Sequence, residues 1–341
     1  MNEEGMARVL SAFSVIGQEA IGTNAEEVLS NAGLNFHTSM EPLYSSKGKP
    51  IKSKFRRIFR EDTDETLGVV GRTYRILQNQ ELANIAGQVV KSGDIMWDRV
   101  GMVGNGERLF LSFQLPEGFS FGHGDAEEQI DVFFYLQNSH DGSSGVKVVP
   151  SPVRLACSNQ FPMLDRFIRK AGIRPQDLTI RHSGLMHERI QDLVRALNIV
   201  NHLTQSFVEE STELLNIEMS QDDRITYYID VLGLKQKEEL MKGGEDYDPV
   251  NNPYGLGTRG NNTLNRVLEL EAADTNNVGD MNGTAWAAFN TVTEYIDHDW
   301  CYNKDGSVND KRVESAILGP AARMKNKAWE IITTPTIEVV Q

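Results

Sequence analysis

Three consecutive strand patterns joined by short turns constrain the fold of this chain more than any other feature. Residues 108–115 alternate between apolar and polar side chains, as a strand covered on one face does. Residues 129–139 are apolar on both faces, which is typical of a central strand. Residues 146–157 add a third strand, in which Pro150 and Pro152 indicate an edge or a bulge. The short connections favour antiparallel pairing.

The segments around these strands indicate the fold class. Earlier strands are expected at 51–60 and 67–77, with a bulge at Gly71, and a helix is expected at 79–93. A further helix at 159–171 follows the three strands. The sequence therefore predicts an α+β fold: an antiparallel β-sheet with a β-β-β-α core backed by helices, followed by a helical C-terminal half.

The same patterns predict three regions. Residues 1–40 are expected to form an N-terminal helical arm, residues 41–180 an α+β core domain, and residues 181–341 a mainly helical region. A seam of apolar residues from 186 to 207 predicts a long helix, for which packing within the chain is favoured over a contact between subunits. The Gly- and Asn-rich stretch 243–263 is predicted to be a mobile loop. Closing helices are expected at 284–298 and 312–329.

Composition limits the classes of protein to which the chain can belong. It has 341 residues, 40% of them hydrophobic, and no run of roughly 18 apolar residues that a membrane span needs. The N-terminus lacks the basic start and apolar core of a secretory signal. Cys157 and Cys301 show no pairing or zinc-site spacing, which indicates free thiols in a reducing compartment. We therefore expect a cytoplasmic protein.

Charge is unevenly distributed along the chain. The formal net charge of −14 counts against a broad basic surface for duplex DNA. Residues 47–60, however, read KGKPIKSKFRRIFR and contain no acid, whereas the next five residues read EDTDE. An acidic protein can still bind phosphates at one focused site.

Strand alternation within this segment predicts a row of cations. One face is expected to carry four basic side chains: Lys52, Lys54, Arg56 and Arg60. A spacing of about 7 Å between alternate residues is similar to the phosphate repeat of an extended single strand. Further cations on other strands are expected to extend the row: Arg72, Arg75 and Arg154. Aromatic residues of the same region are predicted to stack on bases: Tyr74, Phe133 and Tyr135. The alternative is a solvated edge strand whose lysines discourage aggregation.

Other motifs are weaker. Gly255, Gly257 and Gly260 spell GxGxxG, but no strand is expected before them, so a flexible loop is favoured over a dinucleotide site. Glu294 and His298 are four residues apart on an expected helix and are only weak candidates for metal ligands. His140 and Asp141 with the following serines are interpreted as a turn, because a hydrolase triad needs groups from separate elements.

Several segments resemble a phage- and plasmid-associated family known as domain of unknown function 932. They run in order from about residue 50 to 300: LGVVGRTYRILQNQEL, FFYLQNSHDGSSGVKVVPSPVRLACSNQ, IRHSGLMHERI and TAWAAFNTVTEYIDH. The family label implies no particular activity. The succession 108–115, 130–138, 146–157 and 159–171 is also similar to the core of single-strand annealing proteins, the superfamily of Red beta, Erf and the eukaryotic Rad mediators. That similarity implies a positively charged groove and assembly into rings or filaments.

The leading prediction is a phage-type protein that binds single-stranded DNA as a homo-oligomer and assists annealing or recombination in the bacterial cytoplasm, without a nucleotide cofactor. The alternative is an interaction protein that sequesters a host defence or replication factor through its acidic surface. A third hypothesis is a metal-dependent enzyme acting on nucleic acid. Its candidate residues are His182, His187, Glu294, Asp297 and His298.

Overall fold

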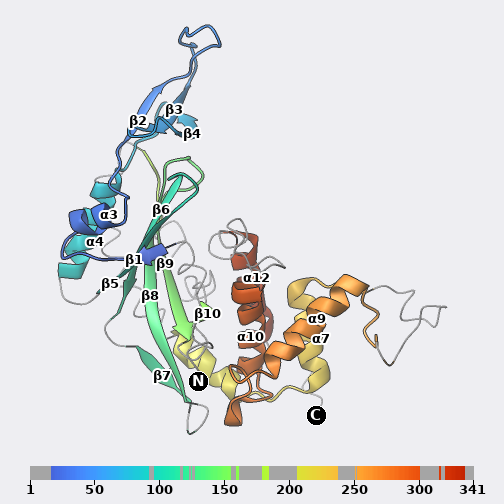
Figure 1. Ribbon diagram of the computed structural model, residues 1–341. Coiled ribbons are helices and arrows are strands. Elements are labelled where there is room, and N and C mark those ends of the chain that lie inside the picture. Colours follow the sequence, from blue (N-terminus) through green and yellow to red (C-terminus); the bar gives the residue numbers. More distant parts are fainter. Residues whose placement is uncertain are drawn as a thin grey trace.

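Two antiparallel sheets of unequal size organise the protein (Figure 1). The computed structural model describes residues 17–91, 96–115, 118–122, 124, 127–154, 159–160, 179–183, 206–236, 250, 252–299, 315 and 319–334. Within them the larger sheet has the strand order β1-β5-β6-β8-β9-β10, with β7 beside β8 and β11 beside β9. Its strands are β1 (Gly17–Glu19), β5 (Met96–Val103), β6 (Arg108–Gln114), β7 (Phe119–Phe121), β8 (Glu128–Ser139), β9 (Val146–Arg154), β10 (Asn159–Gln160) and β11 (Thr179–Ile180).

The middle of the larger sheet is covered on both faces. β6 pairs with β5 on one side and β8 on the other, and residues 109–113 of β6 are all buried, including Ser112. The tight turn between β5 and β6 has Gly104 and Gly106 at positive φ, which glycine adopts without strain. Both faces of β6 therefore lie under other elements, rather than one face being open to water.

The two prolines of β9 lie where the strand has few neighbours. β8 pairs with β9 along its length, whereas β11 and β10 pair only with its two ends, at residues 146–147 and 153–154. Pro150 and Pro152 fall between these ends. A proline lacks the N–H that a continuous second neighbour would require, so the interrupted pairing suits the sequence.

The smaller sheet has the order β2-β3-β4 and lies at one end of the molecule (Figure 1). Its strands are β2 (Thr38–Pro42), β3 (Phe55–Arg60) and β4 (Thr66–Gly71). The bulge expected at Gly71 is instead a register shift between Ile58 and Phe59. β4 also ends at Gly71, so the predicted strand at 67–77 was too long, and β3 begins four residues later than expected.

Two short helices cover one side of the larger sheet. α3 (Ala25–Asn31) is capped by the side chain of Asn24, which accepts from the backbone N–H of Glu27. α4 (Asn79–Lys91) was expected from the sequence and packs on α3 and against β6 and β8. The prediction of a helical arm at residues 1–40 was wrong at Gly17–Glu19, because this stretch forms β1 and pairs with β5.

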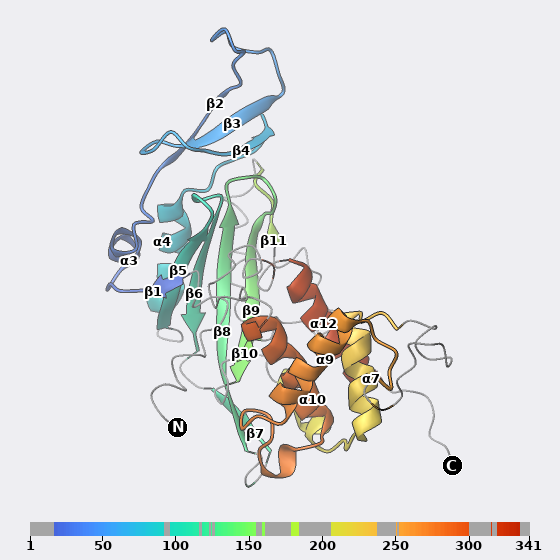
Figure 2. The same cartoon turned by 45° about the vertical axis from the view of Figure 1, so that its right-hand side comes forward.

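The C-terminal helices form a separate layer on the other side of the sheet (Figure 2). They are α7 (Gln221–Leu232), α9 (Thr258–Glu271), α10 (Ala285–Glu294) and α12 (Pro320–Thr333), with a 3-10 turn η3 (Gly279–Met281) and a π-helical turn η4 (Tyr295–Asp299). α10 is buried on all sides and is the centre of this layer. Its Trp286 and Phe289 pack edge-on against Trp329 of α12.

The fold class is confirmed as α+β, with antiparallel sheets and helices in the C-terminal half. The expected helix at 159–171, and residues 186–205 of the expected helix at 186–207, lie outside the described residues. Residues 206–215 are helical. In the described part of the chain, no helix combines the length and apolar character that crossing a membrane demands.

Candidate nucleic-acid interface

The basic segment of the chain forms a projecting hairpin between β2 and β3. Residues 43–54, called here the basic hairpin, extend beyond the smaller sheet and away from the C-terminal helices (Figure 1). Tyr44 and Pro50 form an antiparallel bridge, and Ile51 donates its N–H to the carbonyl of Leu43. Gly48 closes the tip at a φ of 72°. Local hydrogen bonds therefore hold the hairpin in shape without a covering layer.

The basic hairpin carries four lysines that face solvent: Lys47, Lys49, Lys52 and Lys54. None of them forms an ion pair with a carboxylate of the described residues. Arg72 is exposed too and donates its backbone N–H to the carbonyl of Lys54 at 2.9 Å, which places it beside the base of the hairpin. These cations are available to an anionic partner.

The predicted single row of four cations is only partly correct. β3 begins at Phe55, so Lys52 and Lys54 precede the strand and strand alternation does not order them. Arg56 is half-buried and donates to the backbone carbonyls of Ser53 and Phe55 at 3.4 and 3.3 Å. The lysines and Arg56 therefore lie in one region but not on one regular face.

Arg60 does not belong to the interface. Its guanidinium pairs with Asp62 at 2.7 Å, donates to the carbonyl of Asn105 at 2.9 Å, and lies 3.9 Å from the ring centre of Phe36. The hydrogen bond that Arg60 donates to Asp62 raises the pKa of Arg60. Asn105 belongs to the β5–β6 turn, so Arg60 joins the smaller sheet to the larger one. The sequence analysis noted the acidic segment after residue 60, but strand alternation does not show that Asp62, Asn105 and Phe36 hold the Arg60 side chain.

The three arginines expected to extend the row, Arg72, Arg75 and Arg154, lie in different parts of the protein. Arg75 is exposed, and its backbone N–H and carbonyl bond to His182, at 3.2 Å to the carbonyl and 2.9 Å to the ring Nδ1. The backbone of Arg154 pairs with Ile130 in the larger sheet, and its side chain lies outside the described part. Only Arg72 is joined directly to the basic hairpin.

The three aromatic residues expected to stack on bases serve the core instead. Tyr135 is 2% exposed, and burial raises its pKa well above the usual value. The ring of Tyr74 stacks on His182 at 4.5 Å, and its hydroxyl donates to the carbonyl of Ser139. Phe133 is partly buried and packs against the core. Tyr135 is too buried to stack on a base, and the partly buried Tyr74 and Phe133 pack against His182 and the core.

Exposed apolar side chains lie on the basic hairpin and beside it. The sequence analysis did not select them. Tyr44 and Ile51 on the hairpin are 50% and 45% exposed, and Phe55 and Val69 on the adjoining strands are 43% and 53% exposed. The available signal was the interleaving of Tyr44, Ile51 and Phe55 with the lysines. A side chain of this kind at an exposed site is a candidate contact for bases.

Two of the metal candidates, Glu294 and Asp297, are held by protein groups, whereas neither ring nitrogen of His298 has a hydrogen-bond partner among the described residues. Glu294 accepts from Thr275 and Asn276, at 3.0 and 2.7 Å for its Oε2. Asp297 forms a buried ion pair with Lys325 at 2.6 Å. His187 lies outside the described residues, among which no group of three or more His, Cys, Asp or Glu is arranged to hold a metal. The metal-dependent hypothesis thus gains no geometric support from the described residues.

The interpretation of residues 140–144 as a turn is correct. His140 is fully buried, and its Nε2 lies 2.9 Å from Oδ1 of Asn79. Because Asn79 uses its amide nitrogen to donate to the carbonyl of Leu34, its oxygen accepts and His140 donates. Burial lowers the pKa of His140 to about 4. Asp141 instead accepts from the backbone N–H of Ser143.

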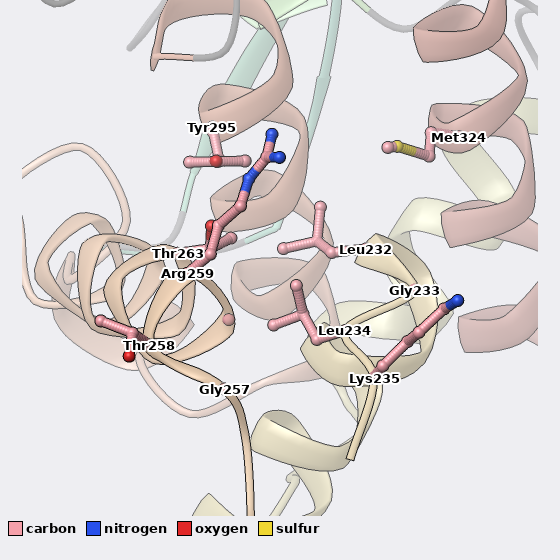
Figure 3. A pocket seen from close by; sticks show the side chains of 11 residues that line it. Leu232, Gly233, Leu234, Lys235, Gly257, Thr258, Arg259, Thr263, Tyr295 and Met324 are labelled. Carbon is pink, nitrogen blue, oxygen red and sulfur yellow. The ribbon is translucent and has the colours of Figure 1, made fainter. Parts of the chain in front are cut away.

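A pocket of about 620 Å³ lies between α7, α9 and α12 (Figure 3). Arg259 and Lys235 line it together with the apolar side chains of Leu232 and Met324.

The GxGxxG segment opens α9, which begins at Thr258, so the predicted loop at 243–263 was wrong for its last six residues. A dinucleotide fingerprint also needs a strand directly before the glycines. Among the described residues directly before Gly257 there is only an isolated bridge, between Gln236 and Leu256.

Comparison with known proteins places most of the chain in one family. The model for the domain of unknown function DUF932 matches residues 66–317. The chain belongs to the DUF932 family. No curated protein and no solved structure matches the chain. The DUF932 match begins at the first residue of β4, so the basic hairpin precedes the matched region.

Proposed function

We propose that this protein binds single-stranded DNA through the basic hairpin and, as an oligomer, assists the pairing of complementary strands. The observation that carries the proposal is the group of four exposed lysines on a projecting element, none of which pairs with a carboxylate in the described part of the chain. Lysines on such a hairpin can follow a flexible phosphate backbone, whereas the net charge of −14 of the whole chain disfavours a wide duplex footprint. The annealing role rests further on the resemblance of the strand succession to annealing proteins.

The salt dependence of binding gives a quantitative expectation. Each phosphate neutralised on a single strand contributes a slope of about −0.7 to the plot of log affinity against log salt. Four lysines that each hold a phosphate therefore give a slope of about −3. A slope near zero for the wild-type protein would show that the contact is not electrostatic and would remove the proposal.

A charge-matched pair of variants tests the location of the site. Changing the four hairpin lysines to alanine should abolish most binding of a labelled oligonucleotide in a fluorescence anisotropy titration. The control changes four exposed cations of the C-terminal layer to alanine: Lys235, Arg259, Arg323 and Lys327. Both variants lose the same formal charge, so equal loss of binding in the two would indicate a general effect of charge and contradict the proposal.

Annealing is tested separately from binding. Two complementary labelled strands should pair faster with the wild-type protein than without it, and the hairpin variant should remove the acceleration. Sizing of the complex with and without oligonucleotide measures its assembly. Tight binding with no acceleration of pairing would limit the function to single-strand binding.

A further inference from the structure

The two faces of the smaller sheet have different surroundings. On the inner face, Ile58 is fully buried, and Gly68 approaches the turn after β8 so closely that a Cβ on it would lie 2.5 Å from Cα of Asp141. Likewise, a Cβ on Gly142 of the same turn would lie 2.9 Å from Cγ1 of Val70. This face rests on the larger sheet. The opposite, outer face is formed by Phe55, Arg57, Phe59 and Val69.

The outer face carries an exposed aromatic ring with space beside it. Phe55 is 43% exposed, and its partner across the strand pair is Gly71. A Cβ on Gly71 would meet no atom within 4 Å, so the surface next to Phe55 is open. Val69 continues this surface along β4 and is 53% exposed. The result is a flat apolar area with an unfilled position beside the ring.

Cations lie around this area. The Lys54 ammonium lies 5.5 Å from the centre of the Phe55 ring, and Arg72 follows Gly71 directly. Arg57 lies 4.8 Å from the Phe59 ring but is held by Glu41 and Asp64, so it orients the surface rather than binding phosphate. An aromatic ring near cations that form no ion pair with the described residues suits an unstacked base whose neighbouring phosphates are bound on either side.

We infer that Phe55 is a base-stacking platform. On this inference, which rests on the proposed function, an unpaired nucleobase stacks on Phe55 in the space over Gly71, and Lys54 and Arg72 hold the adjacent phosphates. The partner is single-stranded nucleic acid, because the bases of a duplex are already stacked on one another and do not expose a free face. The contact would be tolerant of base identity, since every base has a π-face.

Two substitutions and two probes separate stacking from charge. Phe55→Leu keeps an apolar side chain but removes the ring, and Phe55→Trp keeps an aromatic ring. The probes are an oligothymidylate and an oligonucleotide of equal length made only of abasic sites, which has the phosphates without the bases. Met96→Ala, at an exposed apolar residue of β5, is the control.

The expected results are specific to a stacked base. Phe55→Leu should weaken binding of oligothymidylate about tenfold, with the salt slope unchanged, and should leave binding of the abasic probe as in the wild type. Phe55→Trp and Met96→Ala should bind oligothymidylate like the wild type. Wild-type protein should prefer oligothymidylate to both the abasic probe and a duplex.

The failures of the two proposals differ. If Phe55→Leu binds oligothymidylate like the wild type while the four-lysine variant does not, the platform is overturned and single-strand binding stands. Equal weakening on both probes, or a change in assembly state caused by Phe55→Leu, would identify a structural or protein contact and also overturn the platform. If the wild type binds neither probe, the proposed function falls and the platform falls with it.

Discussion

Individual arginines of the smaller sheet differ in role according to the carboxylates near them. Arg57 is paired with Glu41 of β2 and with Asp64, and Arg60 is paired with Asp62, whereas Arg72 has no ion pair with any described residue. A guanidinium already held by a carboxylate and a carbonyl has little to gain from a phosphate. Position on a basic strand therefore does not decide function; the local partners do.

Replacing Arg60 should affect stability rather than binding. Arg60→Ala removes the Asp62 pair, the hydrogen bond to Asn105 and the contact with Phe36, and we expect a loss of about 2 kcal/mol in the free energy of unfolding. Lys52→Ala, at an exposed position, should change it by less than about 0.5 kcal/mol. Urea denaturation measures both. An Arg60→Ala protein of normal stability but weak DNA binding would return Arg60 to the interface.

Stability should depend on the protonation of His140. Its pKa is lowered to about 4 by burial, whereas an unfolded histidine titrates near pH 6.5, so the unfolded state binds the proton first as pH falls. The unfolding free energy should decrease by about 3 kcal/mol between pH 6.5 and 4 from this group. Burial lowers the pKa of His182 too, which adds a change of the same sign.

Denaturation curves at several pH values check this expectation. His140→Gln removes the titrating group and should flatten the dependence between pH 6.5 and 4. His37→Gln, at an exposed position, is the control and should keep the wild-type profile. An unchanged profile in His140→Gln would mean that other groups cause the acid sensitivity.

Among the elements, the positions of strands in the sequence were predicted better than which of their faces are buried. Period-two alternation indicates which residues share a face of β3, but not which face is covered, because that depends on the distant turn at residues 141–142. Tyr135 shows the opposite case. A strand apolar on both faces is buried on both faces, so the pattern of β8 already argued against an exposed Tyr135.

The candidate site was also predicted only in part. The run of lysines without acids identified the basic hairpin correctly as a cationic segment, because composition alone determines its charge. The contacts of Arg60 with Asn105 and Phe36 and the stacking of Tyr74 on His182 join residues far apart in sequence, which one sequence does not reveal. The helix start at Thr258 was missed because Gly and Asn dominate its first turns.

The connection between α12 and η4 should depend on a buried ion pair. Lys325 is 2% exposed and Asp297 is fully buried, so removing one partner leaves a charge without its counter-ion. We expect Lys325→Met to cost about 3–5 kcal/mol of unfolding free energy. Adding Asp297→Asn should recover part of that loss. Chemical denaturation of the two single variants and the double variant measures the coupling energy between Lys325 and Asp297. Losses of unfolding free energy that simply add would contradict a coupled pair.

At the scale of the whole molecule, a positively charged element projects from a negatively charged body. The basic hairpin lies far from the C-terminal helices (Figure 2), and the rest of the chain carries the excess of acid. Like charges on the body repel a polyanion, so binding should be confined to the projection. This separation makes the contribution of the tip measurable without disturbing the core.

Shortening the tip should reduce binding without unfolding the protein. Replacing residues 45–49 by Asn-Gly keeps a tight turn and removes Lys47 and Lys49. The salt slope should become less steep by about 1.4, at a contribution of about 0.7 for each phosphate, and the melting temperature should stay within a few degrees. The double variant Lys47→Ser/Lys49→Ser, at full length, should show the same slope. A slope unchanged in both would exclude the tip from the contact.

The seating of Gly68 against the turn at residues 141–142 has a mechanical consequence. Because no side chain separates the two backbones there, the smaller sheet cannot tilt without displacing the loop that connects β8 to β9. A force that a bound DNA strand exerted on the projection would therefore act on β8 and β9, the two longest strands of the larger sheet.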